Sequence, residues 1–412
     1  MATPGVEVHQ EPDDRPLIDL DEARRRVLEL VGPTTVRTVP IQRAAGAVLG
    51  ADVRTRVDQP PFAHSAMDGY AVRSQDVAQV PVRLEVVAIA AAGHPSARTI
   101  GPGEAARILT GAAMVAGADS VVRVEHTDGG LDTVEVQRAA PPGADVRPAG
   151  EGARRGDVVL ASGTRLHAGH VGVAAAAGHA ELDVIGAPRV AVVSTGDELV
   201  PCDTATLGPG QLFDSNGPTI SRLVASTGCD VTTTHCGDDA PALRSRLAAL
   251  ANDHDAVITT GGISMGGEYD TVRAALAGGD VQFWKVAIRP AKPLAVGRID
   301  GALLFGLPGN PVAAVVAFEL FVRPALRRMR CIEPAVTPIV RGVAGAPLRR
   351  PSGAATHFVR VRTDDDGRWV DTEGRGTHLL GGIADAQALA VLRPGGADLA
   401  PGDELELVPL WA

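Results

Sequence analysis

The stretch Arg189-Val-Ala-Val-Val-Ser-Thr-Gly-Asp-Glu-Leu199 decides the fold class of this chain. A short apolar run that ends in polar residues and a glycine predicts a buried strand followed by a loop. Helices and strands then alternate, with helices predicted over 218–227, 241–252 and 271–277 and strands over 230–234 and 256–260. This alternation predicts a parallel sheet with helices on both faces. Ligands of such sheets bind beyond the carboxyl ends of the strands.

The flanking sequence predicts further domains. A helix is predicted over 20–31, short β-like runs punctuated by glycine and proline fill 75–148, and alternating apolar and polar runs recur after residue 334. The length of 412 residues suggests about three domains of roughly 150 residues, and the 45% hydrophobic content can fill their cores. We therefore predict an α/β multi-domain protein with a central parallel-sheet domain, an inserted β-rich domain and a small C-terminal β domain.

The charge and the cysteine content argue against several classes of protein. A net charge of -10 without a basic run argues against nucleic-acid binding, which needs clustered basic residues to displace counterions. The four cysteines have neither CxxC nor Cys/His ligand spacing, which argues against a disulfide framework or a zinc site. Because no signal-peptide pattern and no long apolar stretch is present, we expect a cytoplasmic protein without a membrane segment.

Both lysines of the chain, Lys285 and Lys292, fall in one eight-residue segment, although the chain has 39 basic residues. Lysine is a compact charge on a flexible stem, whereas arginine is a planar fork. The segment lies between two glycine-containing loops, residues 259–270 and 306–311. This placement predicts a binding site for a phosphate or an oxyanion. The alternative is that both are surface lysines left by a composition that drifts toward arginine.

The loop Thr259-Thr-Gly-Gly262 follows a predicted strand, and Asp270 precedes a predicted helix. Glycines let several backbone N–H groups turn toward one anion, so the loop predicts a phosphate cradle, although such a turn can also be only a turn. Asp197 and Glu198 follow the first strand, at the same edge of the sheet. Carboxylates beside a phosphate predict Mg²⁺, with turn capping by Asp197 as the alternative.

Other residues at this edge have both an ordinary and a functional explanation. Asp238 follows the second strand and could also belong to a helix cap. Asn310 and Pro311 suit the first positions of an apolar helix, and the preceding Pro308-Gly309 would aim the positive end of that helix at the site. Far away in sequence, Asp68 lies in an unusually specific loop, although an aspartate before glycine is normally a turn residue.

Six motifs spread along the chain carry a family resemblance. The motifs are Ser65-Ala-Met-Asp-Gly-Tyr-Ala71, Thr110-Gly111, Ser194-Thr-Gly-Asp-Glu-Leu199, Thr260-Gly-Gly-Ile-Ser-Met-Gly266, Val286-Ala-Ile-Arg-Pro-Ala-Lys-Pro293 and Leu307-Pro-Gly-Asn-Pro311. Together they closely resemble molybdopterin molybdotransferases, the bacterial MoeA family related to the gephyrin E-domain. The resemblance implies an elongated subunit that forms a homodimer. With the patterns above, it implies a disordered tail over 1–16, a linker domain over 17–56 and 149–185, a β-rich domain over 57–148, a molybdopterin-binding domain over 186–333 and a C-terminal domain over 334–412.

The resemblance implies insertion of molybdate into adenylylated molybdopterin, with Mg²⁺-dependent adenylate cleavage and release of AMP. A molybdopterin adenylyltransferase is the implied upstream partner. The residues implied to act in catalysis are Asp68, Thr110, Glu198, Asp238 and Asp270, of which Asp68, Glu198 and Asp270 would hold the metal and Asp68 would come from the partner subunit. The residues expected to bind the substrates are Thr260, Gly261, Gly262, Ser264, Lys285, Arg289, Lys292, Pro308 and Pro311.

The chain departs from the family pattern at several positions. Gly152 stands where the family usually has an aspartate, Arg289 replaces a frequent lysine, and Thr377 replaces a serine. Val359-Arg-Val361 stands where Gln-Arg-Gly is common. Two other classes of function stay open: a metal-dependent nucleotide or phosphate hydrolase, and a non-catalytic scaffold on the same fold.

Overall fold

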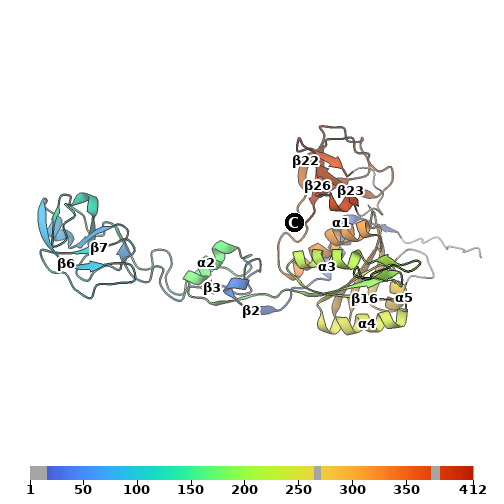
Figure 1. Ribbon diagram of the computed structural model, residues 1–412, viewed down its shortest axis with the longest axis horizontal. Helices are drawn as coiled ribbons and strands as arrows, with labels where there is room; N and C mark the ends of the chain where they lie inside the picture. Colours follow the sequence, from blue (N-terminus) through green and yellow to red (C-terminus); the bar gives the residue numbers. More distant parts are fainter. Residues whose placement is uncertain (1–15, 264–270, 373–380, 412) are drawn as a thin grey trace, which may run out of the picture. The chain divides into compact units, whose positions relative to one another are not determined.

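The computed structural model describes residues 16–263, 271–372 and 381–411. The chain forms two compact units, one built from residues 1–37 and 185–412 and the other from residues 38–184 (Figure 1). Apart from Pro16, the predicted N-terminal tail lies outside the described residues, as do Ser264, Asp270 and Thr377. None of the helices within the described ranges is long and apolar enough to cross a membrane.

The first unit contains a seven-stranded sheet in the order β1 (Leu17–Ile18), β18 (Val281–Val286), β20 (Pro293–Ile299), β21 (Ala302–Leu307), β17 (Ala256–Thr260), β13 (Arg189–Thr195) and β16 (Asp230–Cys236). The strands β21, β17, β13 and β16 are parallel, as predicted. In contrast, β20 is antiparallel to both of its neighbours, so the sheet is mixed rather than wholly parallel. Short connections on either side of β20 leave no room for a crossover helix.

Helices cover both faces of this sheet: α1 (Leu20–Glu29), α3 (Asn216–Ser226), α6 (Pro311–Ala317) and α7 (Arg323–Met329) pack on one face, and α4 (Ala240–Asp253) and α5 (Thr271–Leu276) on the other (Figure 1). Successive side chains of a strand point to opposite faces. Val190 and Val192 of β13 accordingly pack with the first group, and Ala191 and Val193 pack with the second. The continuous apolar run of β13 is therefore buried on both sides.

Local capping fixes where the helices begin. Asn310 accepts a hydrogen bond from the backbone N–H of Ala313 at 3.1 Å, and Pro311 is the first residue of α6, as predicted. Asp239 caps α4 in the same way. The apolar helix predicted to begin at Asn310 and Pro311 is not regular, because residues Phe318–Val322 form a π-helical turn before α7. Pro324, which cannot donate a backbone hydrogen bond, follows this widened turn.

The second part of the first unit is the C-terminal sheet, in the order β19 (Ile288–Arg289), β23 (Thr356–Thr363), β25 (Ala388–Leu392), β26 (Glu404–Pro409) and β22 (Val340–Val343), with β24 (Trp369–Asp371) paired to β23. The short strand β19 lies within the lysine segment and pairs in parallel with β23. This pairing places Arg289 beside His357. The C-terminal sheet is thus joined to the segment that leaves the central sheet after β18.

The second unit is built around a five-stranded sheet in the order β8 (Ser120–Arg123), β5 (Gly69–Val72), β7 (Glu104–Ile108), β6 (Val82–Ala90) and β9 (Thr133–Val136). The strand β5 begins directly after Asp68, and Thr110 follows β7. The unit also contains α2 (Ala168–Ala176), whose first turn is capped by His167 and His170. These two histidines therefore have a structural role at the start of α2.

Candidate functional site

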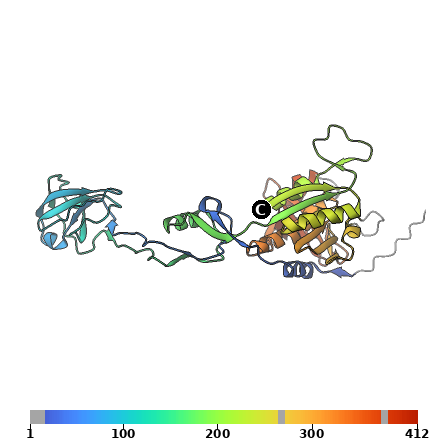
Figure 2. The same ribbon diagram turned by 90° about the horizontal axis from the view of Figure 1, so that it is seen from below.

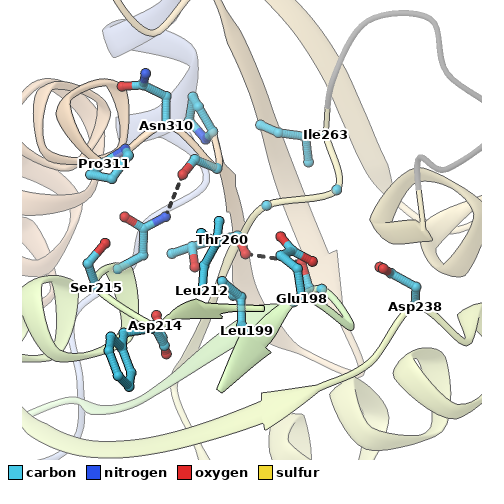
Figure 3. Close-up of a pocket in the computed structure, with 18 of the residues that line it drawn as sticks. Glu198, Leu199, Leu212, Asp214, Ser215, Asp238, Thr260, Ile263, Asn310 and Pro311 are labelled. Carbon is cyan, nitrogen blue, oxygen red and sulfur yellow. Dashed lines mark hydrogen bonds between the residues drawn. The ribbon is translucent and has the colours of Figure 1, made fainter. Parts of the chain in front are cut away.

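The carboxyl ends of β13, β17 and β21 border a cavity of about 610 Å³, the strand-end cavity (Figure 3). Its lining residues are Thr195, Gly196, Glu198, Leu199, Leu212, Phe213, Asp214, Ser215, Asn216, Asp238, Thr260, Gly261, Gly262, Ile263, Pro293, Pro308, Gly309, Asn310 and Pro311. They come from segments that are far apart in sequence and that the parallel strands bring to one edge. The predicted site residues that meet here are Glu198, Asp238, Thr260, Gly261, Gly262, Pro308 and Pro311.

The glycine loop after β17 is shaped by close contacts that exclude side chains. Gly261 and Gly262 have positive φ angles of 99° and 59°, and a Cβ on Gly261 would lie 2.8 Å from Thr195 Oγ1. The N–H of Gly261 donates to the carbonyl of Leu307 at 3.1 Å. This donor therefore holds the loop against β21 instead of facing an anion. The Oγ1 of Thr260 is buried and has no hydrogen-bond partner among the described residues.

Three carboxylates line the cavity, Glu198, Asp214 and Asp238, and Glu198 and Asp238 are held in different ways. Glu198 lies in the turn after β13, where Gly196 has a φ of 136° and a Cβ on it would lie 2.2 Å from Glu198 Oε2. Asp238 accepts hydrogen bonds from Thr271 Oγ1 and from the N–H of Asp197, both at 3.1 Å. Asp197 in turn accepts from the N–H of Asp238 at 3.0 Å. Asp197 therefore braces Asp238 and does not itself line the cavity.

The expected metal ligands are not gathered within the described chain. No group of three or more His, Cys, Asp and Glu side chains suited to a metal occurs in the described ranges. Of the three expected ligands, Glu198 lines the strand-end cavity, Asp68 belongs to the second unit, and Asp270 lies outside the described residues. Glu198 and Asp238 supply carboxylate oxygens to one cavity, and such oxygens suit a hard cation such as Mg²⁺.

The segment 214–216 was not predicted from the sequence as part of the site. Asp214 accepts from Ser194 Oγ at 2.6 Å and from the N–H of Gly217 at 2.9 Å, and Asn216 donates to the carbonyl of Gly309 at 2.8 Å. These bonds tie the start of α3 to β13 and to the turn before α6. An Asp-Ser-Asn run before an apolar helix indicates a cap, but not these distant partners.

A surface excursion, residues 201–211, lies just before this segment, between two short strands. The strands β14 (Leu199–Val200) and β15 (Leu212–Phe213) pair in parallel, and the N–H of Leu212 donates to the carbonyl of Glu198 at 2.7 Å. Figure 2 shows the intervening residues as a green loop that extends from the first unit. The backbone of Glu198 is thereby held from both sides, by the turn at Gly196 and by β15.

A second cavity, of about 760 Å³, adjoins the first and shares Pro293, Pro308 and Asn310 with it. Its ionisable lining residues are Arg289, Lys292 and His357, and no described lining residue is acidic. We call it the basic cavity. Partial burial, followed by the charge of Arg289, lowers the pKa of His357 below its ordinary value.

The structure separates the two lysines. Lys285 is buried and lines a third cavity, with Arg273 and Phe283 among its neighbours. The guanidinium of Arg273 lies 4.7 Å from the centre of the Phe283 ring. Arg289 and Lys292 therefore share a cavity that Lys285 does not line.

In the second unit, the structure brings Asp68 and Thr110 together. The backbone N–H and the Oγ1 of Thr110 both donate to Asp68 Oδ1, each at 2.7 Å. The backbone hydrogen bond, followed by the hydroxyl, lowers the pKa of Asp68. This carboxylate is exposed and ionised at neutral pH.

Comparisons with known proteins cover nearly the whole chain. Residues 18–178 match the MoeA N-terminal region (domain I and II), residues 191–328 match a probable molybdopterin binding domain, and residues 341–410 match the MoeA C-terminal region (domain IV). A molybdopterin molybdenumtransferase 2 of Mycobacterium tuberculosis is 38% identical over 94% of this chain and 98% of its own length. A molybdopterin molybdenumtransferase of Haemophilus influenzae is 32% identical over 95% of this chain and 98% of its own.

A solved structure supports the same grouping. The molybdopterin biosynthesis MoeA protein of Pyrococcus horikosii has a TM-score of 0.81 and 28% sequence identity. The match covers 96% of this chain and 100% of that protein. The likeness therefore extends over all parts of the fold and not only over the central sheet.

Proposed function

The chain belongs to the MoeA family of molybdopterin molybdenumtransferases, and we propose that it inserts molybdate into adenylylated molybdopterin with Mg²⁺-dependent cleavage of the adenylate and release of AMP. Such an enzyme is a transferase of molybdenum cofactor biosynthesis. One observation carries the finer proposal: a cavity with three carboxylates adjoins a cavity with cations and no described acid. Two neighbouring sites of opposite charge suit a metal-bound phosphate group and a free oxyanion.

In this proposal the strand-end cavity receives the adenylate and its phosphates. Glu198 and Asp238 would hold Mg²⁺, and the bound ion would neutralise phosphate charge during cleavage. The Oγ1 of Thr260, which lacks a partner in the described chain, would donate to a phosphate oxygen. The braced geometry of Asp238 and the tight turn at Gly196 would keep both carboxylates in place before the substrate arrives.

The basic cavity would hold molybdate, a tetrahedral dianion, between Arg289 and Lys292. The attraction of one charge pair at 4 Å is about 1 kcal/mol in bulk water and about 4 kcal/mol at an effective dielectric constant of 20. Because Arg289 and Lys292 are exposed, the smaller value applies to the free subunit, and their attraction for molybdate would grow only where the bound substrate displaces water. Substrate binding by Lys285 and Ser264, and metal binding by Asp270, are proposed from the family motifs alone.

We further propose that the enzyme acts as a cytoplasmic homodimer. In the second unit, the exposed Asp68 carboxylate accepts hydrogen bonds from Thr110. In the dimer, Asp68 of one subunit would complete the strand-end site of the other subunit. A molybdopterin adenylyltransferase would supply the substrate. The two hydrogen bonds from Thr110 fix the orientation of the Asp68 carboxylate, which supports a role in holding a metal or orienting a phosphate.

Glu198→Gln tests the role of the strand-end cavity. The change keeps the shape of the side chain and removes its charge, so the protein should fold normally and lose most of its AMP release. Glu181→Gln, at an exposed position of β12 (Glu181–Ile185), is the matched control and should leave the rate unchanged. A wild-type rate of AMP release by Glu198→Gln at limiting Mg²⁺ would rule out the proposed metal role.

A further inference from the structure

We propose that His357 takes up a proton when an oxyanion binds in the basic cavity, and thereby makes oxyanion affinity depend on pH. This inference rests on the proposed function of that cavity. It assigns an oxyanion-binding role to a residue outside the family motifs, since His357 precedes the Val359-Arg-Val361 segment in which the chain departs from the family pattern.

The backbone places His357 beside a cation. In the parallel pairing of β19 with β23, His357 lies opposite Arg289, and both residues line the basic cavity. Residues that lie opposite each other on neighbouring strands have side chains on the same face, close enough to interact. Lys292 lines the same cavity from the loop before β20. A bound oxyanion would therefore meet two permanent cations and one group that can become a third.

The remaining charged groups near His357 are few. His357 and Arg289 also line a smaller cavity of about 190 Å³, together with Arg360 and Asp371. Asp371 is the one acidic residue among the described residues that line these two cavities. Cations thus outnumber carboxylates around the imidazole, which favours its neutral form while the basic cavity holds no anion.

The imidazole itself is available to a ligand. His357 is half-buried and makes no side-chain hydrogen bond to another residue of the described chain. The lowered pKa means that this side chain is neutral in the free protein at neutral pH. A dianion in the cavity reverses the local electrostatics, because an opposite charge nearby favours the protonated form. Protonation then adds a third donor to the oxyanion.

The sign and the size of the pH dependence follow from this linkage. The bound dianion raises the pKa of His357, so the affinity rises as the pH falls through the higher pKa of the complex. It levels off below the lower pKa of the free protein. A rise of about one pKa unit corresponds to a tenfold tighter complex of the protonated form. Because unperturbed histidine titrates near pH 6.5, the change falls between about pH 5 and 8.

Calorimetry with molybdate alone tests the inference. Titrations of the full-length protein at about pH 7, in buffers that differ in ionisation enthalpy, give the number of protons taken up per molybdate. The wild type should take up a measurable fraction of a proton, and His357→Gln should take up almost none and bind more weakly at low pH. His94→Gln, at an exposed position in the second unit, is the matched control and should behave like the wild type. A parallel titration with inorganic phosphate shows whether the cavity prefers molybdate or the phosphate of the pterin.

An NMR titration of the His357 imidazole, with and without molybdate, gives a second readout on the wild-type protein. An upward shift of its pKa on binding supports the inference. Proton uptake that is unchanged in His357→Gln, or an imidazole pKa that does not move while molybdate binds, overturns it and leaves the proposed function intact. If neither molybdate nor phosphate binds saturably to the wild type, the assignment of an oxyanion to this cavity fails, and this inference fails with it.

Discussion

Gly196→Ala should separate the position of the Glu198 carboxylate from its chemistry. A Cβ on Gly196 would lie 2.2 Å from Glu198 Oε2 and 2.7 Å from both Oε1 and Cδ. To move from 2.2 Å to the 3.4 Å of an ordinary contact, the carboxylate must retreat by about 1.2 Å. Because a displacement of about 1 Å in an active site can cost roughly 100-fold in rate, we expect AMP release to fall by about that factor.

The same substitution also strains the backbone, since Gly196 has a φ of 136°. A φ that L-residues rarely adopt costs an alanine on the order of 1–3 kcal/mol, which would lower stability whatever happens at the carboxylate. Gly210→Ala provides the matched control: Gly210 lies in the neighbouring excursion with a φ of 79°, and a Cβ there would meet no atom within 4 Å. Urea midpoints should fall in both variants, and AMP release at saturating substrate should fall only in Gly196→Ala. Equal rates in the two variants would refute the claim that this turn positions Glu198 for cleavage.

Three further predictions concern the two units and the cations. Mixing Asp68→Ala subunits with Glu198→Gln subunits under verified exchange should restore one intact site per heterodimer, and no recovery of AMP release would show that Asp68 does not act across a dimer. Lys292→Arg should raise the molybdate concentration for half-maximal rate while the unfolding temperature stays nearly unchanged; wild-type behaviour of both Lys292→Arg and Lys285→Arg would leave the lysines without a role in binding. Thr110→Val should raise the pKa of Asp68 part of the way to its ordinary value, because only the backbone hydrogen bond remains. Any stability that the Thr110 hydroxyl hydrogen bond gives to the second unit is present at neutral pH and is lost as the pH falls through the lowered pKa of Asp68. If the Asp68 carboxyl titrates in NMR as in the wild type, the hydroxyl is not a cause of the lowered pKa.

Features that depend on neighbouring residues in sequence could be predicted. The cap at Asn310 and Pro311 needs only a polar acceptor and a fixed φ at the start of a helix, and the structure confirms it. The strand that begins at Arg189 and the polar turn after it were predicted from a local apolar run that ends in polar residues and a glycine, and the structure confirms them. The parallel strands bring Glu198 and Asp238 to one edge of the sheet. The central parallel strands follow from the repeated alternation of helix and strand.

Features that depend on residues far apart in sequence could not be predicted in the same way. Asn216 braces a turn 93 positions away, and Asp214 reaches back across the excursion to Ser194. Sequence closeness was also a poor guide within the lysine segment. Lys285 lies inside β18 and Lys292 in the loop before β20, so pairing and strand alternation direct them to different cavities.

Molybdenum transfer itself can be measured by incubating the purified protein with adenylylated molybdopterin, Mg²⁺ and molybdate, and quantifying AMP together with active molybdenum cofactor. We expect AMP and active cofactor to form in equal amounts and both to be lost when Mg²⁺ is removed. AMP release without active cofactor would identify a hydrolase on this fold, and the absence of both products would favour a scaffold; either result would contradict the proposed transferase reaction.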